Sequence, residues 1–318
     1  MQRDSVLSRP RSFARSRRCT FVVLLAFVSG ACAATSRSPD PARPRTNEPA
    51  YPIVLAASTE RREQALAAWA AFTAARAQGP NATPVATTAA ASVAPELQPV
   101  TATISALPTG GGTLLMLPLV EPAGDGAEAA QEATRESLRR FLRDAAGVVG
   151  ATLSELSLIE INDEGGTRRA RYRQRPFAFP LRGGYGEIEI AFTPDRRIVT
   201  LSSTSIPDTE RINRALNAPR TRLTAAEAVQ QLAGRSVTYA DADGRSQTVI
   251  APAAGELAAR ELVVYPLRPA TGGEGGAAAL ELRLAWEIAA SGATPQLLIY
   301  LDAVTGDTIA AAPETVAK

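Results

Sequence analysis

Residues 280–290 have the sequence LELRLAWEIAA, and the alternation within this stretch decides the fold class. Every second residue is a large apolar one: Leu280, Leu282, Leu284, Trp286 and Ile288. A period of two is typical of a strand with one buried face and one face toward water, and such strands form antiparallel sheets. We therefore expect an antiparallel sheet around residues 280–290.

Short apolar runs on both sides of this stretch predict the other strands of the sheet. They are residues 236–240, 246–250, 260–267, 296–301 and 307–309. A helix is expected before them in LTAAEAVQQLAG, residues 223–234. Thr224 can cap its first turn while Glu227 reaches back to the backbone of Thr224, which is the capping-box pattern. This second half of the chain is expected to be a helix followed by a sheet.

The first half repeats this order. Apolar residues at helical spacing predict a helix in residues 131–147, with Gly147 at its end. Strands are expected at residues 156–161, 168–174, 176–185, 186–193 and 197–204. Before the helix, residues 99–108 and 113–120 flank the glycine-rich TGGG and predict a hairpin. The fold class is therefore α+β, with helix and antiparallel sheet occurring twice in succession.

The N-terminus has the pattern of an export signal in residues 1–33. An arginine-rich head precedes the apolar run FVVLLAFV (21–28), which is too short to span about 30 Å of hydrocarbon. Cys32 follows small residues, as the lipid-modified cysteine of a bacterial lipobox does, although Ser29 stands where that pattern has an aliphatic residue. Lipidation of Cys32 and ordinary cleavage after Ala31 or Ala33 are the two alternatives.

Residues 34–97 are expected to form a linker that contains one helix near residues 59–77. The Pro/Ser-rich start of this linker is typical of a disordered tether. Leu66, Trp69 and Phe72 give the helix an apolar stripe, for docking on the following domain or for binding a partner. We favour docking.

The charge distribution excludes a nucleic-acid-binding protein. The net charge is +2, but residues 1–33 contain six arginines and one aspartate, so the remainder of the chain has a net negative charge. Only 5% of the residues are aromatic. A nucleic-acid-binding surface needs basic groups to contact the phosphates, and we expect no such surface in this chain.

The two halves resemble the FTP and PepSY modules found in the propeptides of the fungalysin and thermolysin metallopeptidases. For FTP the resemblance lies in residues 171–203, with Gln174, Pro180, Gly183 and Gly184 at matching places; for PepSY it lies in Trp286, Asp302 and Gly306. It implies an FTP-like module over residues 98–215 and a PepSY-like module over 220–318. It also implies two successive cystatin-like/PepSY-like units, which in the propeptide setting inhibit or help to fold a peptidase.

The chain contains no histidine, so it cannot supply the HExxH zinc site of those peptidases. The resemblance is therefore to propeptide modules without the catalytic domain, and we expect no enzyme activity, cofactor or metal. The expected function is that of an exported envelope binding protein whose partner is a protein such as a secreted peptidase. A structural surface lipoprotein with no such partner is the alternative. An N-terminal lipid on Cys32 would place either one on a bilayer, in the periplasm or at the outer membrane.

One strand has an unusual run of arginines. Strand alternation would place Arg169, Arg171, Arg173 and Arg175 on one face, which is a candidate surface for an acidic partner. The alternative is a solvated face balanced by Glu187 and Glu189. In the DAVTG turn near the C-terminus, Asp302 and Gly306 are expected to hold a hairpin locally without a ligand.

Overall fold

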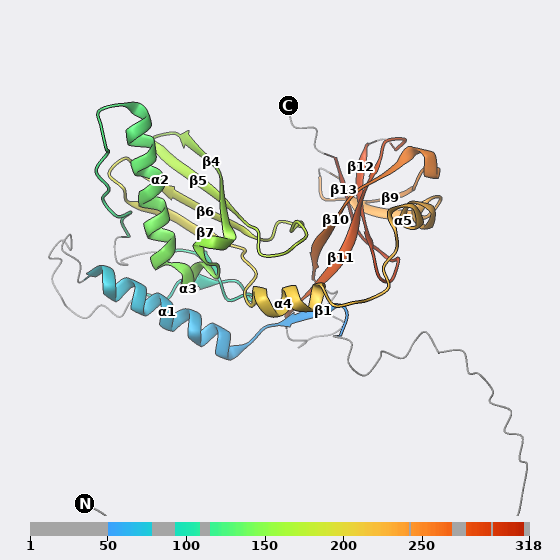
Figure 1. The fold of residues 1–318 in the computed structure, drawn as a ribbon, viewed down its shortest axis with the longest axis horizontal. Helices are drawn as coiled ribbons and strands as arrows, with labels where there is room; N and C mark the ends of the chain where they lie inside the picture. Colours follow the sequence, from blue (N-terminus) through green and yellow to red (C-terminus); the bar gives the residue numbers. More distant parts are fainter. Residues whose placement is uncertain are drawn as a thin grey trace, which may run out of the picture. The chain divides into compact units, whose positions relative to one another are not determined.

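The computed structural model describes residues 50–77, 93–108, 115–241, 243–268, 278–293 and 295–314 (Figure 1). The predicted signal segment, Cys32 and residues 34–49 of the predicted tether lie outside the described residues. The described chain is α+β. None of the helices in the described ranges is both long and apolar enough to cross a membrane.

The helical elements are α1 (Thr59–Ala77), α2 (Ala127–Asp144), α3 (Ala146–Val149), α4 (Thr209–Leu216), α5 (Ala225–Leu232) and the 3-10 turns η1 (Leu153–Glu155) and η2 (Ala254–Glu256). The strands are β1 (Ile53–Ala56), β2 (Glu96–Leu97), β3 (Ile104–Ala106), β4 (Leu156–Glu164), β5 (Thr167–Gln174), β6 (Glu187–Phe192), β7 (Ile198–Ser203), β8 (Ser236–Ala240), β9 (Ser246–Ile250), β10 (Leu257–Leu267), β11 (Ala279–Ala290), β12 (Leu297–Asp302) and β13 (Thr308–Pro313).

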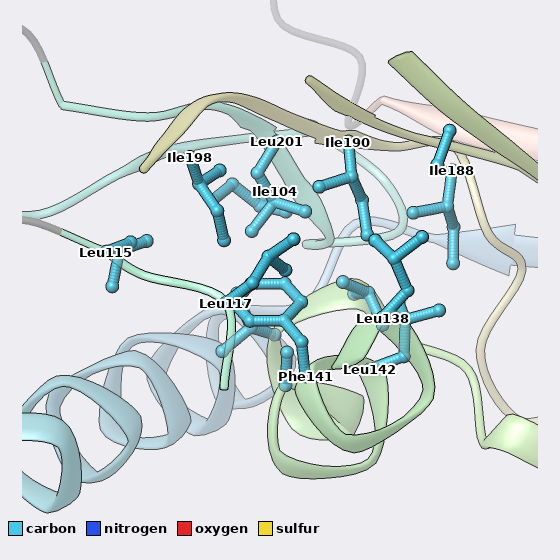
Figure 2. Close-up of a cluster of buried hydrophobic side chains, with 14 of the residues drawn as sticks. Ile104, Leu115, Leu117, Leu138, Phe141, Leu142, Ile188, Ile190, Ile198 and Leu201 are labelled. Atoms are coloured by element: carbon cyan, nitrogen blue, oxygen red, sulfur yellow. The ribbon is translucent and has the colours of Figure 1, made fainter. Parts of the chain in front are cut away.

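Strands β4 to β7 form a four-stranded antiparallel sheet in chain order. Ile188 and Ile190 on β6 are fully buried, as the alternation of this strand predicts. Figure 1 shows α2 along one face of the sheet. Leu138, Phe141 and Leu142 of α2 lie against these isoleucines in one apolar cluster (Figure 2). Fully burying one such side chain contributes about 1.5–3 kcal/mol, so this face holds helix and sheet together.

Helix α1 belongs to the same apolar cluster. Trp69 and Phe72 are buried in it, and the Phe72 ring meets the Phe141 ring edge-on with centroids 5.6 Å apart. The preferred interpretation of the apolar stripe, docking of the helix on the following domain, is therefore confirmed.

The predicted end of the second helix is wrong. Helix α2 ends at Asp144, and α3 then carries the chain past Gly147 as far as Gly150. Gly150 has a φ of 74°, so this glycine is the left-handed residue that ends α3. Gly147 instead lies close to α1, since a Cβ at this position would be 3.1 Å from the Cβ of Ala68.

Two strand predictions in the first half are also wrong. Residues 104–106 do not form a hairpin with 115–120: β3 pairs with β2, and Met116 bridges to Arg197 next to β7. Residues 176–185 do not form a strand, and their one β-bridge joins Leu181 to Val264 of β10. Local alternation indicates extended backbone in both cases but does not specify the pairing partner.

The stretch 280–290 lies in β11, at the centre of a five-stranded antiparallel sheet. Strand β10 pairs with one side of β11, and β12 pairs with the other, with β13 beyond it. Strand β1 pairs with residues 279–282 of β11, on the side that β12 occupies further along. Residues 53–77 of the predicted linker 34–97 therefore belong to the folded part, as strand β1 and helix α1.

Two helices cover the inner face of the five-stranded sheet. Helix α5 starts with the predicted capping box at Thr224, and Ala228 and Leu232 pack against Ile288. Helix α4, which was not predicted, packs against the earlier part of β11. Strands β8 and β9 form a separate hairpin, and Val237 and Tyr239 of β8 belong to the same cluster as α5.

Candidate functional site

Strand β5 carries three arginines on the exposed side of the four-stranded sheet. Arg169, Arg171 and Arg173 alternate with the buried residues Ala170 and Tyr172. The three arginine side chains are between 41% and 45% exposed. Together they form the surface called the arginine face below.

Arg175, the fourth arginine predicted for this surface, lies just beyond the end of the strand. Strand β5 ends at Gln174, and the backbone N–H of Arg175 donates to the carbonyl of Glu155 at 2.7 Å. Alternation places side chains only as far as the strand continues, so the arginine face has three arginines.

Every arginine of this face contacts a carboxylate. The pairs are Arg169 with Glu189 (2.9 Å) and Glu164 (3.2 Å), Arg171 with Glu160 (2.9 Å) and Glu187 (3.7 Å), and Arg173 with Glu187 (3.2 Å). Hydrogen bonds from Asn162 and Arg171 hold the pKa of Glu160 below its ordinary value. Exposed pairs of this kind contribute about 0–1 kcal/mol each. The face is therefore a ladder of both charges across β4, β5 and β6, not a basic patch.

Gln174 is a buried tether between β5 and the segment after β7. Its side-chain amide donates to the carbonyl of Ile206 at 3.1 Å, and its side-chain oxygen accepts from the N–H of Ile206 at 2.9 Å. Only 1% of Gln174 is exposed. Because both polar ends of the side chain are bonded away from water, the position has a structural role.

Pro180, Gly183 and Gly184 lie in the segment that covers the free edge of β10. The N–H of Val264 donates to the Pro180 carbonyl at 2.8 Å, and the Val264 carbonyl accepts from the N–H of Arg182 at 3.0 Å. Gly183 lies next to β10, where a Cβ would be 3.4 Å from the Tyr265 ring. The carbonyl of Gly184 accepts the Thr204 hydroxyl at 3.1 Å. These residues therefore join the two sheets.

Asp302 is fully buried and organises the turn after β12. Its Oδ1 accepts the N–H groups of Val304 at 2.8 Å and Thr305 at 3.0 Å. Its Oδ2 lies 3.1 Å from Arg283 on β11. A buried carboxylate is stable only when its oxygens are bonded in this way.

Tyr51 supplies a further partner of Asp302, and the sequence pattern did not indicate it. The Tyr51 hydroxyl donates to Asp302 Oδ1 at 2.9 Å and accepts the N–H of Leu284 at 3.0 Å. Its ring lies 4.8 Å from the guanidinium of Arg220. Burial and the nearby Asp302 carboxylate raise the pKa of Tyr51 above its ordinary value, so the hydroxyl stays protonated. The short run IVLA after Pro52 was the signal that could have revealed this strand.

Trp286 and Gly306 lie where α5 meets the five-stranded sheet. The Trp286 indole N–H donates to the carbonyl of Leu223, just before the helix, at 2.8 Å. Gly306 has a φ of 77°, and a Cβ there would be 2.1 Å from the side-chain nitrogen of Gln231 on α5. Glycine is needed here for both reasons.

A second buried charge lies on the outer face of β11. Arg182 Nε is 2.9 Å from Glu287 Oε2, and the same guanidinium contacts Glu261. The Tyr300 hydroxyl donates to Glu287 at 3.3 Å, and burial raises the pKa of Tyr300. This group has no signature in the sequence, because Arg182, Glu261, Glu287 and Tyr300 come from four separate segments.

The hollows found in the described part of the chain are small. One of about 370 Å³ lies between α1 and α3, and one of about 110 Å³ lies beside residues 181–187. Within the described ranges, no group of three or more His, Cys, Asp or Glu side chains is placed to hold a metal. The carboxylate of Asp241 accepts the N–H groups of Asp243 and Arg245 in its own turn.

Comparison with known proteins gives a weak similarity to solved structures only. No family model matches the chain, and no curated protein matches it. Among solved structures, the C-terminal domain of Bacillus megaterium YpeB is similar over 65% of this chain and 74% of its own, with 12% identity and a TM-score of 0.27.

Proposed function

We propose that this chain is an exported, non-catalytic binding protein of the cell envelope, built from FTP-like and PepSY-like modules. It acts in trans on a secreted peptidase, as an inhibitor or a folding helper. The observation that carries the proposal is the open arginine face, whose charged side chains are all more than 30% exposed. A chain without histidine also has no imidazole for a zinc site or a catalytic triad.

The arginine face suits recognition more than tight burial. A ladder of alternating charges fixes the register of a partner that carries the complementary order of charges, and it raises the rate of association. Each arginine can exchange an exposed intramolecular carboxylate for one on the partner at little cost, because exposed pairs are weak. Specificity would then reside in the order of the charges along β4, β5 and β6.

The test is addition of the purified chain to a secreted zinc peptidase of the thermolysin type, followed by measurement of peptidase activity and refolding yield. The triple variant Arg169→Glu/Arg171→Glu/Arg173→Glu should lose the effect. The matched control reverses three arginines of α2 that also pair with glutamates: Arg135, Arg139 and Arg140. Wild-type protein that changes neither readout would contradict the peptidase partner.

A second function is favoured by the same ladder. Since each arginine is already neutralised by a neighbouring strand, the face also suits a structural surface lipoprotein that binds no peptidase. That function predicts that both triple variants behave like the wild type in a pull-down from envelope extract, and that deletion affects only envelope integrity.

The membrane attachment in both proposals depends on Cys32. Palmitate labelling of cells should mark the chain, and Cys32→Ser should abolish the label. Labelling that persists in this variant would remove Cys32 as the attachment point.

A further inference from the structure

Strand β9 presents an open backbone edge. Within the β8–β9 hairpin, the N–H of Ala251 donates to Arg235 and the N–H of Asp241 donates to Arg245. In an antiparallel pair the bonded residues alternate, so residues 247 and 249 also face β8. The N–H and C=O groups of Ser246, Thr248 and Ile250 therefore point away from the hairpin. No described strand pairs with this edge.

Two other edge strands in the described part of the chain, β4 and β10, are protected against pairing. Strand β4 has a bulge after Leu158 and carries acidic side chains. Strand β10 is covered at Val264 by residues 180–182, and Pro266 has no N–H to offer. Bulges, charges, proline and covering segments are the usual devices that keep sheet edges apart.

Strand β9 has none of these devices. Its sequence SQTVI contains no charge and no proline, and its register with β8 shows no bulge. Ile250 is 66% exposed, more than any other large apolar side chain in the described ranges. The edge is bounded at one end by Gly244 and at the other by Pro252. The open edge is thus short and well defined.

We propose that two copies of this chain pair through β9, antiparallel and about a two-fold axis at Thr248. In this register Thr248 lies opposite Thr248 of the second copy, and Ser246 lies opposite Ile250. All three outward-facing residues then meet outward-facing residues, which allows about six backbone hydrogen bonds. No charged side chain opposes another within the paired strands.

The self-complementarity of this edge is what selects a second copy as the partner. A two-fold interface must bring the same surface against itself, so any charge on it would face its own copy. The charged edge of β4 fails this condition, and the uncharged edge of β9 meets it. The product is a continuous four-stranded ribbon with the order β8, β9, β9, β8.

Analytical ultracentrifugation of the full chain tests this pairing. The expected result is a concentration-dependent monomer–dimer equilibrium. Thr248→Lys places two like charges at the axis and should raise the dissociation constant by about ten-fold or more. Thr238→Lys is the matched control, since Thr238 lies beside Thr248 on the same hairpin face, but its two copies would be about 14 Å apart.

A chain that stays monomeric up to about 1 mM would overturn the proposal, because a Kd above this value is too weak for specific pairing. An equal loss of dimer in the Thr238→Lys and Thr248→Lys variants would also overturn it, and so would a dimer that Thr248→Lys leaves unchanged.

A cysteine at the axis gives a second readout that does not depend on affinity. In a background with Cys19 and Cys32 replaced by serine, Thr248→Cys should form an intermolecular disulfide under mild oxidation. The Cα atoms of a hydrogen-bonded pair of residues in an antiparallel sheet are about 5.5 Å apart, which is within the range of a disulfide.

Thr238→Cys is the control and should not cross-link. Cross-linking of both variants, or of neither, would refute the register. The result is independent of any peptidase partner, which the arginine face tests separately.

Discussion

Replacing Tyr51 by phenylalanine removes one oxygen atom from the contact between β1 and the rest of the five-stranded sheet. Two hydrogen bonds are lost, one to Asp302 and one from the N–H of Leu284. The phenylalanine ring can keep its place beside Arg220, so apolar burial is unchanged. The variant therefore isolates the hydroxyl.

The expected cost follows from the partners that remain. Asp302 keeps two backbone N–H donors and Arg283, so it loses a single charge-assisted bond of about 1.5–3 kcal/mol. The N–H of Leu284 loses its acceptor, which costs about 1–3 kcal/mol where water cannot replace it. We expect a total near 3 kcal/mol, equivalent to a fall in Tm of about 6–12 °C for a fold of this size.

The assay is urea unfolding followed by the fluorescence of Trp69 and Trp286, combined with amide hydrogen exchange at Leu284. The Leu284 amide should exchange faster in the variant, because its acceptor is gone. Tyr185→Phe is the control, since the Tyr185 hydroxyl only accepts an exposed bond from Arg268. A Tyr51→Phe variant within about 0.5 kcal/mol of the wild type, or no less stable than Tyr185→Phe, would contradict this prediction.

Three further changes test other positions of the fold. Gly306→Ala should cost about 2 kcal/mol or more in thermal unfolding, because its φ is 77° and the new Cβ would collide with Gln231. Gly244→Ala is the control and should cost only about 1 kcal/mol, because its φ is 76° but no neighbour lies within 4 Å. Equal losses would show that the contact with Gln231 contributes nothing. Gln174→Ala should cost about 2–4 kcal/mol in urea unfolding, because two buried backbone groups lose their partners, and a loss below about 1 kcal/mol would show that water replaces the amide. Burial raises the pKa of Tyr172 to about 12 from an ordinary value of 10.0, so its contribution to the free energy of unfolding should be fully present below pH 10 and fall by about 2–3 kcal/mol as the pH rises past 12; Tyr172→Phe should flatten that slope in unfolding measured against pH.

Features that depend on neighbours in sequence were predictable. The alternation in residues 187–192 and 280–290 and the capping box at Thr224 are local patterns, and the structure contains each of them. A side-chain period of two fixes which face is buried, and a cap fixes where a helix begins. Neither pattern requires knowledge of the rest of the fold.

Features that depend on distant partners were not predictable. Strand β1 has four residues, and its partner β11 lies more than 220 residues further along the chain. Four residues are too few to show a period, and nothing local links Tyr51 to Asp302. The wrong hairpin at residues 99–120 has the same cause, because extended segments take their partners from the tertiary fold.

The positions that carry the family resemblance are structural in this chain, and this bears on where its function can lie. Gln174 and Asp302 are 1% and 0% exposed, and their polar atoms bond within the fold. Side chains that are buried and fully bonded cannot select a partner, so a chain can keep them all and bind nothing in common with other proteins of similar fold. Partner choice must then depend on exposed groups that the resemblance does not fix. The two proposed surfaces, the arginine face and the edge of β9, lie on different sheets, so a variant of one should leave the other unaffected.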